Sequence, residues 1–144
     1  MDTPAAPTRS AWLLGLTGLV PFVAGTGATW LLPTPQGPHA AFALAAYGAT
    51  IVAFLGGLHW GLAARSGQSA LQYAWGAVPS LVAWGALLLP TRSALAVLAS
   101  ALVACYAVDR RVLPAQGLAG WRPLRLVLTV VAAGSCLVAA SALR

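Results

Sequence analysis

The fold is decided by residues 47–61, which read YGATIVAFLGGLHWG and form the centre of the second long apolar segment. This stretch carries no Asp, Glu, Lys or Arg and predicts one membrane-buried helix. Small residues recur along it at every fourth position, where a neighbouring backbone can approach closely. We call this set the small-residue ribbon: Ala45, Ala49, Ala53, Gly57 and Gly61. His59 lies about 200° around the helix from Gly57, so two faces of this helix are expected to meet protein.

The composition places the chain in the membrane. Of its 144 residues, 60% are hydrophobic and 7% are charged, and the mean hydropathy is +0.83. Soluble domains carry about 25% charged residues, so this chain is expected to be an all-α integral membrane protein. The net charge of +6 comes from arginines beside apolar segments. Orientation in a bilayer explains that charge better than nucleic-acid binding, and no nucleic-acid partner is expected.

The inventory of reactive residues predicts no catalytic, cofactor or metal site. Asp2 and Asp109 are the acidic residues of the sequence, which excludes a multi-carboxylate metal or glycosidase site. Cys105 and Cys136 lie in apolar stretches and suggest neither a disulfide framework nor a CxxC redox site. One internal histidine, His59, is too little for a zinc or haem site, and no serine stands in a GxSxG or SxxK context. An intramembrane enzyme is therefore the less favoured interpretation.

We expect a disordered cytoplasmic tail over residues 1–10 and a single helical domain over residues 11–144. Prolines and polar turns divide the domain into five transmembrane spans, at residues 11–32, 40–64, 70–89, 93–109 and 123–143. Pro21 and Pro79 lie near the middle of the first and third spans and predict helix kinks. A cleaved signal peptide is the competing interpretation of the first segment, which is long and is interrupted by glycines and a proline.

Arginine distribution predicts the orientation. With five spans, the amino terminus and the loops after the second and fourth spans share one side of the membrane. That side holds Arg9, Arg65, Arg110, Arg111, Arg122 and Arg125, whereas the other side holds Arg92 and Arg144. Because cytoplasmic loops are enriched in arginine, the amino terminus is expected in the cytoplasm and the carboxyl terminus outside.

The same topology predicts a cluster of polar residues at the cytoplasmic end. His59 lies about 9 Å inside the second span, Asp109 ends the fourth span, and Arg125 lies one turn into the fifth. Tyr106 shares the helix face of Asp109. An ionisable group near the bilayer centre costs at least ~2.5 kcal/mol, so such groups pair or face a cavity. The functional interpretation is a proton or substrate site; the favoured structural one is an Asp109–Arg125 clasp, with His59 bonded to a nearby carbonyl.

Several motifs carry a resemblance to a known family. They include LVPF at residues 19–22, FLGGLHWG at residues 54–61, PSL at residues 79–81, and Tyr106 with Asp109. Together they resemble the transmembrane-protein-69-like family of small multi-span proteins from proteobacteria and the mitochondrial inner membrane. Relatives usually carry a serine where this chain has Ala53. The resemblance implies multi-pass residence in a bacterial inner membrane and marks His59, Trp60, Asp109 and Arg125, but it supplies no reaction.

Helix packing is the function that the sequence favours. We expect an assembly or accessory partner of a larger membrane complex, with the lipid bilayer and another membrane protein or a second copy as its partners. The alternative is a small transporter or channel with a polar site around His59 at the cytoplasmic mouth. A polar cavity enclosed by the spans would favour the alternative, and an exposed small-residue face would favour the accessory role.

Overall fold

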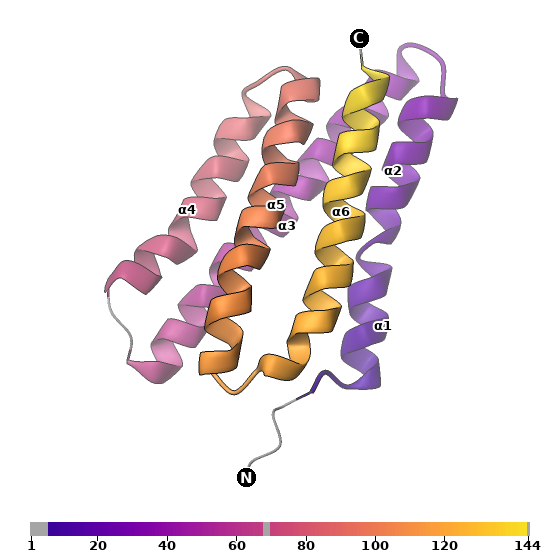
Figure 1. Cartoon of the computed structure of the whole chain (residues 1–144). Helices are drawn as coiled ribbons and strands as arrows, with labels where there is room; N and C mark the ends of the chain where they lie inside the picture. Colours follow the sequence, from indigo (N-terminus) through magenta and orange to yellow (C-terminus); the bar gives the residue numbers. More distant parts are fainter. Residues whose placement is uncertain (1–5, 68–69, 144) are drawn as a thin grey trace.

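The computed structural model describes residues 6–67 and 70–143 and is a bundle of antiparallel helices (Figure 1). In order along the chain, its elements are α1 (Arg9–Thr17), α2 (Val20–Leu31), α3 (Gln36–Ser66), α4 (Ala70–Leu87), α5 (Thr91–Ala115), the short 3₁₀ helix η1 (Ala119–Trp121) and α6 (Arg122–Ala142). No strand occurs in the described ranges, which confirms the expected all-α class. Residues 1–5 of the expected disordered tail lie outside the described residues.

The first predicted span is two helices rather than one kinked helix. Pro21 has no N–H group, so the carbonyl of Thr17 cannot receive its usual helical hydrogen bond. α1 accordingly ends at Thr17, and α2 begins at Val20 with Pro21 in its first turn, where proline is tolerated. The break leaves the carbonyl oxygen of Gly18 to accept a hydrogen bond from the hydroxyl of Tyr47 on α3, at 2.9 Å. This bond satisfies a polar group that hydrocarbon could not.

α1 also begins earlier than the predicted span. The side chain of Thr8 accepts a hydrogen bond from the backbone N–H of Ala11 at 3.2 Å and caps the helix. α3 likewise begins at Gln36 rather than at residue 40, with Pro38 in its first turn. It ends at Ser66 and is followed by Gly67, whose φ of 60° is the left-handed conformation that glycine adopts readily. α1 and α3 therefore include residues that the sequence places in the tail and in the loop before the second span.

α3 and α4 come closest at two glycines. A Cβ atom on Gly56 would collide with the carbonyl oxygen of Gly76 and approach the ring of Pro79 to 3.2 Å. A Cβ atom on Gly76 would collide with the indole of Trp60. Pro79 is buried inside α4, which continues through it to Leu87. The backbones of these helices can meet because neither contact residue has a side chain.

The small-residue ribbon is only half inside the bundle. Ala45 and Ala49 are buried, with exposures of 0% and 6%, and Ala53 is half-buried. Gly57 and Gly61 are exposed, and a Cβ atom on either would meet nothing within 4 Å. Each four-residue step turns the helix about 40° beyond a full turn, so the ribbon rotates by about 160° from Ala45 to Gly61. The expectation that one face would pack along its whole length is wrong for its last two members.

α5 and α6 lie side by side and supply much of the core. Buried members of this pair include Leu95, Leu98 and Leu102 on α5 and Cys136 and Ala139 on α6. α5 continues past Asp109 to Ala115, instead of ending at Asp109 as the spans predict. Asp109 therefore lies inside a helix, where its side chain is directed by the helix face rather than by a loop.

The chain is a multi-pass membrane protein. Among the described residues, four helical stretches are long and apolar enough to cross a membrane: Arg9–Leu31, Gln36–Arg65, Thr91–Ala115 and Ala119–Ala142. α4 is not one of these four stretches; its 18 residues would extend about 27 Å. The start of α1 and the end of α6 lie at opposite ends of the bundle (Figure 1).

Candidate functional site

Two core faces of the bundle end in a polar residue. On α3, Gly48, Val52, Leu55 and His59 follow one another at intervals of four, three and four residues, and all are buried. On α5, Leu98, Leu102, Cys105 and Asp109 follow with the same spacing and are also buried. This spacing averages close to 3.6 residues, so each row stays on one face of its helix. His59 and Asp109 are thus directed inward by the apolar pattern that precedes them.

Asp109 binds side chains from two other helices. The Nε2 atom of His59, on α3, lies 2.9 Å from its Oδ1 atom. Since an ionised carboxylate only accepts hydrogen bonds, Nε2 carries the hydrogen and donates. Arg125, on α6, donates from Nε to Oδ2 at 2.7 Å and from Nη2 to the same oxygen. We call these three residues the polar cluster. It joins α3, α5 and α6, and both carboxylate oxygens are occupied.

The polar cluster is buried. The side chains of His59, Asp109 and Arg125 are 4%, 9% and 12% exposed. Removing charges from water is unfavourable by several kcal/mol per ion, and here the opposite charges of Asp109 and Arg125 and their paired hydrogen bonds offset that cost. Removing either partner would leave the other charge buried and unpaired. The cluster thus favours the packing of α3, α5 and α6 against one another, because separating these helices would leave the charges of Asp109 and Arg125 unpaired.

Two expectations about this region are corrected. His59 bonds to Asp109 and not to a freed backbone carbonyl. Tyr106 is half-buried, and within the described ranges it makes no hydrogen bond with the polar cluster. The Nδ1 atom of His59 is buried and has no hydrogen-bond partner among the described residues. One polar atom of the cluster is therefore left unsatisfied by the protein.

The polar cluster lines a cavity of about 340 Å³ at the end of the bundle where α3 and α5 finish and α6 starts. We call it the basic-end cavity. Arg65, in the last turn of α3, and Trp121, in η1, also line it. These two residues were missed as site residues, because Arg65 reads as a topology signal and Trp121 as part of a loop. Only the packing of η1 against α5 and α6 brings Trp121 to the cavity.

A smaller cavity, of about 190 Å³, lies on another side of Arg125 between α1, α2, α3, α5 and α6. Apart from Arg125 and Thr129, its walls are apolar side chains and glycines. The hydroxyl oxygen of Thr129 is buried and has no partner within the described ranges. The polar lining therefore does not continue far beyond the polar cluster.

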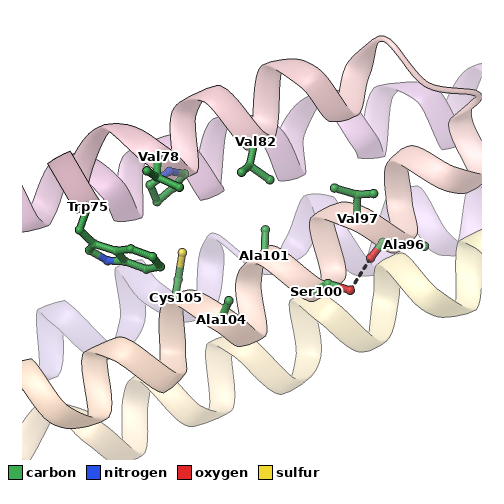
Figure 2. A pocket seen from close by; sticks show the side chains of 10 residues that line it. Trp75, Val78, Val82, Ala96, Val97, Ser100, Ala101, Ala104 and Cys105 are labelled. Carbon is green, nitrogen blue, oxygen red and sulfur yellow. Dashed lines mark hydrogen bonds between the residues drawn. The ribbon is translucent and has the colours of Figure 1, made fainter.

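A larger apolar cavity, of about 510 Å³, lies between α4 and α5. Figure 2 shows the indole of Trp75 beside the side chain of Cys105, with Val78 and Val82 farther along α4. Ser100 donates its hydroxyl to the carbonyl oxygen of Ala96 at 3.0 Å, within its own helix. No charged side chain lines this cavity.

No group of three or more His, Cys, Asp or Glu in the described part of the chain could hold a metal ion.

Comparison with known proteins matches residues 7–141 to the family described as "Protein of unknown function (DUF3429)". The chain is also similar to "Transmembrane protein 69" of Xenopus tropicalis, at 38% identity over 134 residues. That match covers 86% of this chain and 51% of the relative, so the chain spans about half the length of the frog protein. No solved structure matches. The resemblance carried by the sequence motifs is thereby confirmed.

Proposed function

The chain belongs to the DUF3429 family of transmembrane-protein-69-like membrane proteins, and we propose that it acts by helix packing, as an assembly or accessory partner of a larger membrane complex. The partner is a second membrane protein or another copy of this chain. We also propose that the chain crosses a bacterial inner membrane five times, with the amino terminus in the cytoplasm and the carboxyl terminus outside.

The exposed part of the small-residue ribbon is the observation that carries this proposal. Gly57 and Gly61 form a GxxxG motif on α3, and open space lies above both. Gly57 lines a groove of about 370 Å³ between α3 and α4, together with residues that include Ala53 and Ala77. Small residues at this spacing let a second transmembrane helix approach closely. Apart from the adjacent part of α3, no side chain or backbone of the described residues lies within 4 Å of a Cβ atom built on either glycine, which leaves room for a partner helix.

Two features support the proposed topology. Successive long helices run in opposite directions, so the basic ends of α1, α3, α5 and α6 gather at one end of the bundle (Figure 1). Those ends carry the six arginines that outnumber Arg92 and Arg144. Such an excess is typical of the cytoplasmic side of a membrane protein.

The test is co-purification of the tagged full chain from native membranes, read by quantitative mass spectrometry. Gly57→Leu fills the space above α3 and is expected to remove the bound partner, or the second copy, while leaving the melting temperature of the chain unchanged. The matched control is Gly134→Leu on α6, since a Cβ atom there also meets nothing within 4 Å. Gly134→Leu is expected to keep the partner. Equal partner recovery with Gly57→Leu and with the native chain would refute the docking role.

A second candidate function is transport at the His59 region. Its support is that the polar cluster lines a cavity of about 340 Å³ instead of being packed solid. The apolar walls of the cavity beyond Arg125 weigh against a continuous polar path. A pH-sensitive dye inside proteoliposomes tests it: a transporter or channel would acidify the lumen faster with the native chain than with His59→Gln. Equal rates would exclude proton movement through this region.

A further inference from the structure

The basic-end cavity has the shape and chemistry of a small ligand site. Its volume of about 340 Å³ lies within the range of about 300–1,000 Å³ found for small-molecule pockets. Its lining includes polar groups, from the polar cluster with Arg65 and Trp121. Most of the lining surface is apolar, and Leu58 and Leu113 contribute to it. A ligand that matches both kinds of lining carries a polar head and a hydrocarbon part.

Among the polar groups that line the cavity, hydrogen-bond donors exceed acceptors. A guanidinium group has five N–H donors, and Arg125 uses two of them on Asp109. The other three have no partner in the described part of the chain. Trp121 also lines the cavity, and its indole N–H is a donor only. Both oxygens of Asp109 are already occupied. The available donors therefore call for a ligand that brings acceptor oxygens.

The charges favour an anion. Arg65 and Arg125 bring two positive charges to the lining and Asp109 brings one negative charge, so one positive charge is in excess when His59 is neutral. Arg110, Arg111 and Arg122 lie at the same end of the bundle and are exposed. The planar fork of an arginine matches the geometry of a phosphate, which accepts two parallel hydrogen bonds.

His59 adds a requirement that a bare anion does not meet. Because its Nε2 atom donates to Asp109, the Nδ1 atom of the neutral ring is an acceptor. His59 is 3% exposed, and its Nδ1 atom has no partner within the described ranges. A ligand hydroxyl that reaches this atom from the cavity would satisfy it. The oxyanion therefore has a hydroxyl on it or next to it.

We propose that the basic-end cavity binds a phosphate group that carries or adjoins a hydroxyl, with Arg125 and Arg65 on the phosphate oxygens and His59 Nδ1 accepting from the hydroxyl. Two sources share this chemistry: the glycerol headgroup of an anionic phospholipid, and free hydrogen phosphate. The apolar wall would hold the acyl chains of the first. Gly61 lines this cavity and also belongs to the docking face on α3, whereas Gly57 does not line the cavity. Occupation of the cavity requires no movement of the ligand across the membrane.

The experiment uses the full chain, purified in detergent and delipidated. The probes are short-chain phosphatidylglycerol, phosphatidylcholine of the same chain length, and sodium phosphate against sodium chloride at equal ionic strength. Native mass spectrometry counts bound lipid, and the rise in melting temperature with concentration gives the affinity. We expect one phosphatidylglycerol per chain, bound at least tenfold more tightly than phosphatidylcholine. Saturation by sodium phosphate would assign the site to free phosphate, and saturation by lipid alone would assign it to the headgroup.

Arg65→Gln is the test variant, because Arg65 is exposed and its loss should not disturb folding. It is expected to weaken binding by roughly threefold to tenfold. Trp121→Phe, which removes the indole N–H and keeps a ring, is the second variant and is expected to weaken binding as well. The control is Arg111→Gln, at the same end of the bundle but outside the cavity lining. No saturable binding by any probe, or equal weakening in Arg65→Gln and Arg111→Gln, would overturn the proposal.

Discussion

Neutralising Asp109 tests the polar cluster most directly. Asp109→Asn keeps the shape of the side chain but removes the charge that Arg125 and His59 share. Arg125 is 12% exposed, so its charge would remain largely buried and unpaired. Breaking a buried ion pair by removing one partner costs about 3–5 kcal/mol. Because the amide oxygen can still accept hydrogen bonds from Arg125, we expect a loss near the lower end, about 3 kcal/mol.

A double-mutant cycle separates this pairing from general damage. In an Arg125→Gln background no buried positive charge is left unpaired, so Asp109→Asn should then cost only about 1 kcal/mol. The resulting coupling of about 2 kcal/mol lies within the range found for residues in direct contact. The assay is unfolding of the purified full chain in mixed micelles, with the free energy taken from the denaturant midpoint. If Asp109→Asn lowered the free energy of unfolding by the same amount in the native and the Arg125→Gln backgrounds, the ion-pair reasoning would be refuted.

Further predictions concern packing, the helix break and topology. Gly56→Leu should lower the melting temperature strongly, since a Cβ atom there collides with the backbone of α4, whereas Gly57→Leu should leave the temperature unchanged; equal losses would contradict the rotation of the ribbon. Tyr47→Phe should cost about 1 kcal/mol in chemical unfolding because it frees the carbonyl at the α1–α2 break, and an unchanged stability would show that this bond contributes nothing. Reporter fusions after Gly117 and after Arg144 should report cytoplasm and outside respectively, and the same compartment for both would rule out five spans.

The sequence alone predicts the fold class of the protein and the residues of the polar cluster. Apolar composition and helix-length segments predict a helical membrane protein, because hydrocarbon requires every backbone hydrogen bond to be satisfied within the segment. The cost of burying charge singled out His59, Asp109 and Arg125, and counting residues at the helical rise placed them at one end of the membrane. These inferences need only distance along a helix and the chemistry of one residue at a time.

The tertiary structure decided which faces meet. The small-residue ribbon was read at a period of four, but an α-helix repeats at 3.6, so Gly57 and Gly61 rotate out of the core while Gly56 takes the close contact with Gly76. His59 can bond Asp109 only because α3 and α5 are neighbours. The sequence of one helix does not show how that helix is rotated about its axis relative to another. Trp121 and Arg65 reach the basic-end cavity for the same reason: their position around the bundle is set by packing between helices far apart in the chain.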